Sequence, residues 1–301
     1  MQKSRSSPQM ATKLRIALCQ MAVTKSKEAN VAKAVAMIAQ AKAEHNADVV
    51  VLPECFNCPY GTKYFGDYAE AVPALGPVAP DAAAASPTAA QLSAAAKAAG
   101  VTVIGGSIPE KAEGKLYNSS LSFAPNGDLL GVHRKMHLFR INTEKVKFDE
   151  AEVLTAGDTP TVVPLGAACT AGVGICFDIR YPLLAATYQQ RGTSVLFYPG
   201  AFNMVTGPKH WTHAARSRAV DTQQFVALCS PARDPDFEYV AWGHSLVVDP
   251  WGEVVVEAGE AETIVAAEID LAAVATTRAQ LPITAGIRHD LYEVAWKKAA
   301  A

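Results

Sequence analysis

The sequence lacks an excess of charge of one sign, a long apolar run and an export signal, and each absence excludes a class of protein. Its 301 residues carry 27 Lys and Arg against 29 Asp and Glu, a formal net charge of −2. No overall basic field would attract a polyanion, which argues against nucleic-acid binding. No uninterrupted apolar run reaches the roughly 18 residues that a membrane-spanning helix needs. The composition, 50% hydrophobic and 19% charged, is typical of a globular protein.

The first ten residues, MQKSRSSPQM, are basic and rich in Ser but lack the apolar segment of a secretory signal. We expect residues 1–12 to be a disordered leader, with a mitochondrial address as the alternative, and residues 13–301 to form a single domain. The expected location is the cytoplasm, where a chain of this size keeps its cysteines as thiols. The six cysteines are Cys19, Cys55, Cys58, Cys169, Cys176 and Cys229.

Cys55 and Cys58, in the segment CFNC, have a spacing found in some metal and redox sites. No second pair of Cys or His with zinc-ligand spacing accompanies them. We therefore expect no metal. The alternative, a zinc-thiolate protein, would be detected as stoichiometric metal by elemental analysis.

Apolar runs typical of strands alternate with stretches of helical periodicity along the chain. Residues 48–54, DVVVLPE, are almost wholly apolar, as in strands buried on both faces of a sheet. The dipeptide Asn126-Gly127 between two apolar runs predicts a tight hairpin. Because hairpins interrupt the alternation, we expect an α/β fold, α+β in some schemes, and not a simple doubly wound sheet. The expected helices cover 27–46, 88–99, 182–191 and 208–222. The other expected strands cover 14–21, 101–108, 120–134, 171–178, 194–202, 224–230, 244–258 and 263–270. Residues 271–281 and 289–298 are expected to be helical or irregular.

Two pairs of segments resemble each other and suggest internal symmetry. VVVLPECFN (49–57) is similar to VLFYPGAFN (195–203), and FAPNGDLLG (123–131) is similar to VVDPWGEVV (247–255). Two related half-folds packed as layers would produce such matches, and chance similarity is the alternative for matches this short. In the first pair Gly200 takes the place of Glu54, so a site built at these positions would be asymmetric.

Three polar residues follow apolar runs, where open α/β sheets place their functional sites. Glu54 ends VVVLPE, Lys135 follows LLGVHR, and Cys176 follows AGVGI. The glycines of AGVGIC could permit a tight strand-to-helix turn that exposes a nucleophile. Taken singly, each has a plain alternative: a helix cap or surface residue for Glu54, a solvated lysine for Lys135 and a buried structural thiol for Cys176.

Together these residues lie in segments that resemble a known family. DVVVLPECF, GVHRKMHLF and GVGICFDIRYP are similar, in order and spacing, to the three active-site motifs of the nitrilase superfamily of carbon–nitrogen hydrolases. The resemblance covers residues 13–298 and narrows to the omega-amidase branch through NCPYGTKYF (57–65), YPGAFNMVTGPKHW (198–211), RSRAVD (216–221), SPARD (230–234) and YVAWGHS (239–245). Cys58 departs from that branch, where serine is usual. The resemblance implies a four-layer α-β-β-α sandwich of the nitrilase type with internal pseudo-two-fold symmetry, no cofactor and a homodimer or higher homo-oligomer.

The resemblance also implies a catalytic role for each polar residue. Cys176 would be the nucleophile, Glu54 the general base, and Lys135 with the backbone N–H of Phe177 the oxyanion donors. This assignment is chemically reasonable because an unperturbed thiol, with a pKa near 8.5, needs a neighbouring base or cation to react at neutral pH.

A second carboxylate follows in the segment VKFDE. Glu150 resembles the family's auxiliary glutamate, which would position Lys135 or the leaving amine. The preceding segment is one residue shorter than in the branch, so Asp149 is the alternative. His133 and His137 flank Lys135, and we interpret them as structural or substrate-adjacent, not as metal ligands.

The expected substrate is a small omega-amide of a 2-oxo dicarboxylate. Arg180 resembles the arginine that holds the distal carboxylate, and its planar fork suits bidentate binding. Phe202, Thr206 and Tyr60 would line the same pocket, although Phe202 could equally be a core residue. Phe177-Asp178 replaces the Trp-Glu of true nitrilases, which favours amides over nitriles.

Two other functions remain open at this point. Within the class, the chain could hydrolyse deaminated glutathione or N-carbamoyl compounds. Outside it, the chain could be a non-catalytic scaffold with the same fold. Release of ammonia by the purified protein separates an enzyme from a scaffold.

Overall fold

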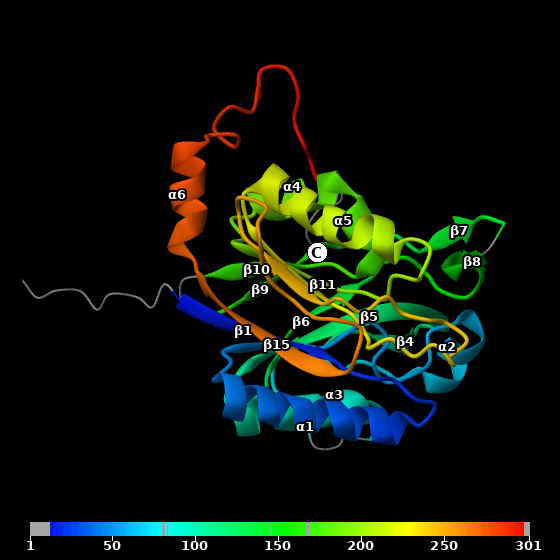
Figure 1. The fold of residues 1–301 in the computed structure, drawn as a ribbon. Coiled ribbons are helices and arrows are strands. Elements are labelled where there is room, and N and C mark those ends of the chain that lie inside the picture. The colour runs from blue at the N-terminus through cyan, green and yellow to red at the C-terminus, as the bar shows by residue number, and fades with distance from the viewer. Residues whose placement is uncertain (1–12, 80–81, 83, 145, 167–168, 298–301) are drawn as a thin grey trace, which may run out of the picture.

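The computed structural model describes residues 13–297 except 80–81, 83, 145 and 167–168. Residues 1–12, predicted to be a disordered leader, lie outside the described residues. The elements form four layers, two helical and two of strands (Figure 1). Helices α1 (Lys27–His45) and α3 (Pro87–Ala99) cover one sheet, and α4 (Pro182–Gln190) and α5 (Gly207–Thr222) cover the other. The predicted α-β-β-α sandwich is confirmed.

The first sheet has the order β15-β1-β2-β3-β5-β4, with β6 also paired to β5. β1, β2 and β3 are parallel, and the remaining neighbours are antiparallel. The predicted hairpin at Asn126-Gly127 joins β5 to β6, and Gly127 has a φ of 92°. The strands are β1 (Lys13–Gln20), β2 (Val49–Val51), β3 (Thr102–Ile104), β4 (Ile108–Ala112), β5 (Lys115–Phe123), β6 (Leu129–Arg134) and β15 (Thr263–Asp270).

The second sheet has the order β14-β13-β12-β11-β10-β9. Its central strands β10, β11 and β12 are parallel, and the outer pairings are antiparallel. The strands are β9 (Thr161–Pro164), β10 (Thr170–Val173), β11 (Val195–Pro199), β12 (Phe225–Cys229), β13 (Leu246–Val248) and β14 (Val254–Glu257).

The two sheets repeat one topology. In each, helices join three parallel strands, an antiparallel hairpin follows on one side, and an antiparallel strand flanks the other. The similar segments 49–57 and 195–203 begin in the middle parallel strands, β2 and β11. The other similar pair forms the β5–β6 and β13–β14 hairpins. The predicted internal symmetry therefore holds at the level of topology.

Local signals set the helix ends, and apolar side chains hold the layers together. Ser26 caps α1 by accepting a hydrogen bond from the Ala29 N–H, and α1 ends at Asn46 in the left-handed conformation. α3 begins with Pro87 and ends at Gly100, with a φ of 63°. Between the sheets lies a dry core formed by inward side chains of both, among them Ile16, Leu18, Val51, Val173, Phe197 and Ala227.

Several predicted boundaries are wrong, and short elements were missed. β2 pairs only over Val49–Val51, so Leu52–Glu54 lie beyond the sheet, and β10 ends at Val173. The missed elements are α2 (Thr62–Tyr68), the hairpin of β7 (Arg140–Asn142) and β8 (Lys147–Asp149), and the 3-10 turns η2 (Glu150–Glu152) and η3 (Cys176–Arg180). α6 (Ala272–Gln280) ends the regular structure, and residues 289–297 are irregular.

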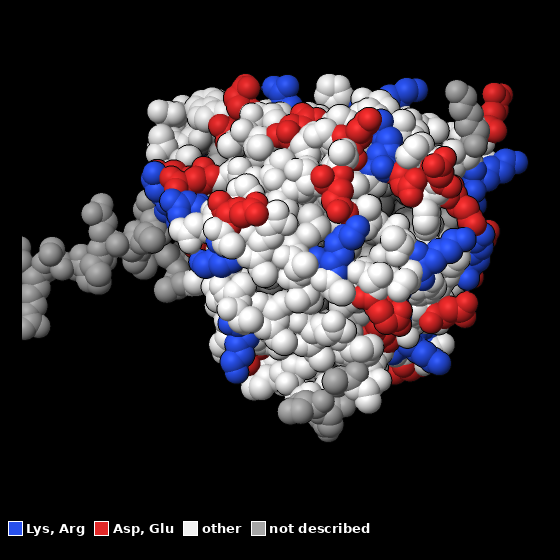
Figure 2. Space-filling view, turned by 60° about the horizontal axis from the view of Figure 1, so that its bottom comes forward, with Lys and Arg blue, Asp and Glu red and all other residues white. Residues whose placement is uncertain are grey.

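The surface agrees with the near-zero net charge of the sequence. On the face that Figure 2 presents, Lys and Arg side chains are intermingled with Asp and Glu. Within the part of the chain that the structure describes, no helix is long and apolar enough to cross a membrane.

Candidate active site

The structure brings Glu54, Lys135, Glu150 and Cys176 together between the two sheets. Glu54 lies three residues after β2, Lys135 directly follows β6, and Glu150 and Cys176 begin η2 and η3. Glu54 is 1% exposed, Cys176 4%, and Lys135 and Glu150 are fully buried. Four chain segments from both halves therefore meet in one buried site.

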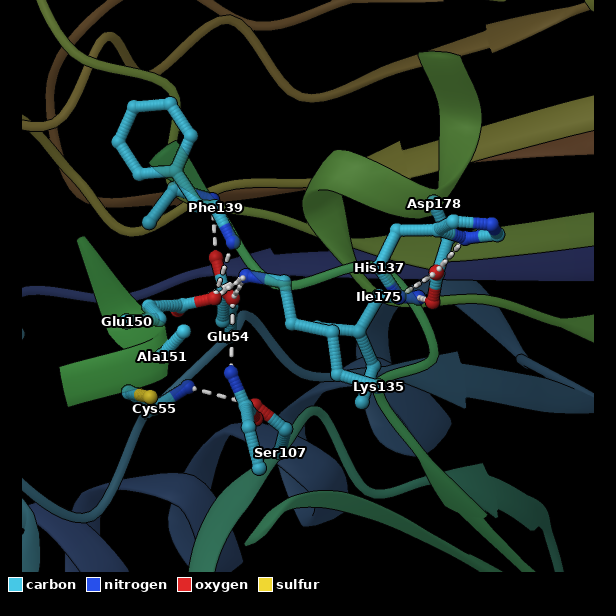
Figure 3. Close-up of polar contacts among 12 residues, drawn as sticks. Glu54, Cys55, Ser107, Lys135, His137, Phe139, Glu150, Ala151, Ile175 and Asp178 are labelled. Atoms are coloured by element: carbon cyan, nitrogen blue, oxygen red, sulfur yellow. Dashed lines mark hydrogen bonds and ion pairs between the residues drawn. The ribbon is translucent and has the colours of Figure 1, made fainter. Parts of the chain in front are cut away.

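Lys135 lies between the two carboxylates (Figure 3). Its Nζ donates to Glu54 Oε1 at 2.9 Å and to Glu150 Oε1 at 2.9 Å. Burial by itself lowers the pKa of Lys135, but the charges of Glu150 and Glu54 outweigh this and hold the pKa well above its usual value. The lysine is therefore a fixed ammonium.

Glu54 is held by three donors. Besides Lys135, the Asn118 side-chain amide donates to Oε1 at 2.9 Å, and the Ala201 N–H donates to Oε2 at 2.9 Å. Burial raises the pKa of Glu54, and the negative charge of Glu150 adds to this, while Lys135 opposes both. A carboxylate with a raised pKa is a stronger base than one in water.

Glu150, and not Asp149, contacts Lys135. Tyr60 Oη donates to Glu150 Oε1 at 2.7 Å, and the Phe139 N–H donates to Oε2 at 2.6 Å. Asp149 instead accepts from the Ala151 N–H at 3.0 Å as the cap of η2. The shorter preceding segment has thus not displaced Glu150 from the position that the sequence indicated.

Cys176 itself has the left-handed backbone conformation, with a φ of 46°. This conformation is unfavourable for a non-glycine residue and often marks functional sites. Burial raises the pKa of the Cys176 thiol well above its usual value, Glu54 raises it further, and Lys135 opposes them. The resting residue is thus a protonated thiol beside a base.

The glycines before Cys176 have a different role from the one predicted. A Cβ at Gly172 would lie 2.5 Å from the Tyr188 ring, and one at Gly174 would lie 2.5 Å from the Tyr198 ring. Neither glycine is among those with positive φ. They make room for two aromatic rings, and the sharp turn occurs at the cysteine.

Asp178 was missed as a site residue and braces two motifs. Its carboxylate accepts from the Ile175 N–H at 2.9 Å and from the His137 N–H at 2.9 Å (Figure 3). His137 Nδ1 lies 2.8 Å and His133 Nε2 3.1 Å from the same carboxylate. Burial alone would raise the pKa of Asp178, but the bonds from both histidines and the backbone hold it well below its usual value. The histidines interpreted as structural therefore tie the segment of Lys135 to the turn of Cys176.

A small cavity opens on the Cys176 thiol. Its empty volume is about 180 Å³. Its lining includes four of the residues predicted to contact substrate, Phe177, Arg180, Phe202 and Thr206. Phe139, Ala201 and Tyr239 complete the lining and were not predicted; Tyr239 begins the quoted segment YVAWGHS, which was the available signal.

Tyr60 does not line this cavity. It borders an adjoining cavity of about 410 Å³, together with Glu54 and Cys55, and its hydroxyl is bonded to Glu150. Ala201 and Tyr239 border both cavities. Tyr60 therefore reaches the site through Glu150 and lies on the Glu54 side of it.

Arg180 has no carboxylate partner among the described residues. Its guanidinium carbon lies 5.5 Å from the centre of the Phe177 ring and 4.7 Å from that of Phe202. Its Nε is buried without a hydrogen-bond partner. Arg180 forms no salt bridge with Asp178, because the Asp178 carboxylate contacts His133 and His137.

The site has the parts of a cysteine hydrolase. It offers a thiol, a carboxylate base, a fixed ammonium and a small cavity with a cation at the side of the thiol. Among the described residues no group of three or more His, Cys, Asp or Glu side chains could hold a metal ion. Such a combination suits attack on a carbonyl-like carbon followed by loss of an amine.

The chain belongs to the carbon–nitrogen hydrolase family, whose model matches residues 15–279. It is 50% identical over 290 residues to an omega-amidase NIT2 of Bos taurus, covering 96% of this chain and 100% of the relative. It is 47% identical to omega-amidase NIT2 of Homo sapiens, covering 95% and 99%.

The fold agrees with a solved structure of this group. Saccharomyces cerevisiae Nit3, a member of branch 10 of the nitrilase superfamily, superposes with a TM-score of 0.82 and 40% identity, covering 92% of this chain and 97% of that one. Both the predicted family and the predicted fold are confirmed.

Proposed function

We propose that this protein is an omega-amidase that hydrolyses the side-chain amide of 2-oxoglutaramate or 2-oxosuccinamate to the dicarboxylate and ammonia. The observation that carries the proposal is Arg180, whose guanidinium has no carboxylate partner among the described residues and lies on the small cavity that Cys176 also lines. A substrate with a carboxylate at one end and an amide at the other would fit between them. The relatives named omega-amidase NIT2 support the same reaction.

The first half-reaction forms a thioester. Glu54 takes the thiol proton as Cys176 Sγ bonds to the amide carbon, and the carbonyl oxygen becomes an oxyanion held by Lys135 and the Phe177 N–H. The tetrahedral intermediate collapses, the carbon–nitrogen bond breaks, and Glu54 returns its proton to the leaving nitrogen. Ammonia leaves, and the acyl group stays on sulfur.

The second half-reaction uses water. Glu54 takes a proton from a water molecule whose oxygen attacks the thioester carbon, and the same donors hold the second oxyanion. Collapse breaks the carbon–sulfur bond, and the proton returns to the Cys176 thiolate. No cofactor takes part in either step.

Glu150 has a positioning role in this scheme. It holds Lys135 from the side opposite Glu54, and it is itself fixed by Tyr60 and the Phe139 N–H. The ammonium therefore cannot rotate away when Glu54 accepts a proton and its attraction to Lys135 weakens. This role accounts for the wholly buried second carboxylate.

A substrate panel tests the proposal. Purified protein is incubated with 2-oxoglutaramate, 2-oxosuccinamate, an N-carbamoyl amino acid and a neutral aliphatic amide, and the ammonia released is measured. Deaminated glutathione is tested in parallel by the free dipeptide amine that its hydrolysis releases, because that reaction yields no ammonia. The two omega-amides are expected to have the highest kcat/KM. A preference for deaminated glutathione or the carbamoyl compound would assign the alternative activity within the class, and no product from any of them would favour the scaffold.

The proposal extends to assembly and location. We propose a homodimer or higher homo-oligomer in the cytoplasm, with residues 13–301 as a single domain. All six cysteines are free and buried, which fits a reducing compartment. Light scattering of the purified protein would measure the assembly, and a mass of one chain would contradict it.

A further inference from the structure

Among the residues that the structure describes, Arg180 has one polar side-chain partner, and it comes from a different element. Arg180 Nη1 lies 3.1 Å from Nδ1 of His210, which lies in the first turn of α5. His210 is exposed and does not line the cavity beside Cys176. It therefore touches the residue proposed to bind substrate and lies outside the cavity.

The chemistry of this contact fixes the state of the imidazole. A guanidinium has only donors, so His210 Nδ1 must accept, and its proton must be on Nε2. The groups that act on His210 are all basic: Arg180, Lys209 and His213. Desolvation of the ring, and then the charge of Arg180, lower the pKa of His210, so the imidazole is neutral at neutral pH.

The other surroundings of Arg180 fix the guanidinium much less firmly. The Phe177 and Phe202 rings give it apolar and cation–π contacts, which permit rotation and sliding. No ion pair restrains it within the described residues, and its Nε has no partner. The hydrogen bond that Arg180 donates to His210 is then the one directional contact that orients the guanidinium before substrate binds.

We propose that His210 is a positioning residue that orients Arg180 for the distal carboxylate and thereby sets the selectivity for anionic over neutral amides. The inference rests on the proposed omega-amidase function. With Nη1 held by His210, the remaining donors of the fork are presented to the cavity. Orienting them before binding lowers the entropy lost when the carboxylate is bound. The expected result of losing His210 is weaker binding of the anionic substrate, with little change in the chemical step.

Two substitutions of His210 separate an acceptor from mere bulk. His210→Asn keeps an acceptor close to the position of Nδ1, whereas His210→Leu keeps the volume and removes the acceptor. His210→Leu should raise KM for 2-oxoglutaramate about fivefold to twentyfold and change kcat by less than about twofold. KM for a neutral amide should not change, and His210→Asn should restore most of the loss. His213→Leu, on the exposed side of the same helix, is the matched control.

A double-mutant cycle tests whether His210 acts through Arg180. In an Arg180→Met background, His210→Leu should cause no further loss, because the group that it orients is gone. Equal losses from His210→Leu for anionic and neutral amides, or no rescue by His210→Asn, would overturn the proposal. If Arg180→Met itself fails to discriminate between the amides, then the proposed function fails. If only the His210 variants are silent, the positioning role alone fails.

Discussion

The loops that follow β2 and β11 have equivalent places in the topology but different residues at the site. Beyond β2 the chain reads Leu-Pro-Glu-Cys, whereas β11 ends with Pro199 and the chain continues as Gly-Ala. The two loops meet, since the Ala201 N–H donates to Glu54 Oε2 at 2.9 Å. A Cβ at Gly200 would lie 3.3 Å from the Cys176 Cα and 3.1 Å from the Trp211 ring, so a glutamate would not fit there. One half therefore supplies the proposed base, and the other leaves room for the proposed nucleophile.

The largest difference should be between the two cysteines with positive φ, one in each half: Cys176, whose loss should abolish activity, and Cys55, whose loss should not. Cys176→Ala removes the nucleophile and should lower kcat by at least about 10³-fold, with the melting temperature nearly unchanged. Cys55, with a φ of 50°, follows Glu54 but has no role in the reaction, so Cys55→Ser should keep most activity. Ammonia release and thermal unfolding measure both variants. More than a few per cent of activity in Cys176→Ala would exclude covalent catalysis by this thiol.

The next largest effect should come from Asp178, whose carboxylate links the segment of Lys135 to the turn of Cys176. The pKa of Asp178 in the folded protein is lower than in the unfolded chain, so its contribution to stability is present above about pH 4 and is lost as the pH falls towards the folded value. Asp178→Asn should lower the free energy of unfolding by about 3 kcal/mol at pH 7 and flatten its decline below pH 5. Urea unfolding between pH 3 and pH 7 measures this. Parallel curves for the two proteins would show that Asp178 contributes no such charge.

Arg180 tests whether the second half also selects the substrate. A charge-assisted contact contributes roughly 1.5–3 kcal/mol, so Arg180→Met should lower kcat/KM for 2-oxoglutaramate about tenfold to a few hundredfold. Hydrolysis of neutral amides should change little because they have no carboxylate. Steady-state kinetics on both substrates provide the measurement. Equal losses, together with a lower melting temperature, would assign Arg180 a structural role.

The smallest effect should follow from making the two loops more alike. Gly200→Ala adds a methyl group against Trp211 and the backbone of Cys176, so both must shift by a few tenths of an ångström. Because catalysis depends steeply on position, kcat should fall about threefold to tenfold. KM should stay within about twofold of its original value. An unchanged kcat would mean that the close approach at Gly200 does not position the thiol.

The site was predictable to the extent that its residues belong to strand ends. Glu54, Lys135 and Cys176 each follow an apolar run at the end of a strand, the usual place for a functional site in α/β sheets. Glu54 and Lys135 follow strands of one sheet and Cys176 follows a strand of the other, so their meeting depends on how the two sheets pack. The contacts that support them were not predictable. Asp178 and His137 lie 41 positions apart in the chain, and no local pattern reports that they are bonded. Tyr60 was expected on the substrate cavity from the family resemblance. A tyrosine in a loop gives no local signal for the side of Glu54 on which it lies.

Short elements were the weakest part of the fold prediction. α2 has seven residues, and β7 and β8 have three each, too few for a period to be recognised. The tight turn that exposes Cys176 was attributed to its neighbouring glycines because glycine is the usual residue in such turns. The packing of the Tyr188 and Tyr198 rings, which explains those glycines, depends on residues from other elements.

The buried trio of Glu54, Lys135 and Glu150 has a consequence for how the net charge of the site changes during turnover. With the ammonium between two carboxylates, the resting trio carries one net negative charge. When Glu54 takes the thiol proton, that charge moves to sulfur and then to the oxyanion, and the total stays at minus one in each proposed intermediate. The free energy needed to remove this charge from water is therefore spent once, when the chain folds, and not again in each turnover. For this reason the rate of the chemical step should depend only weakly on ionic strength. Binding of the anionic substrate should depend on it more strongly.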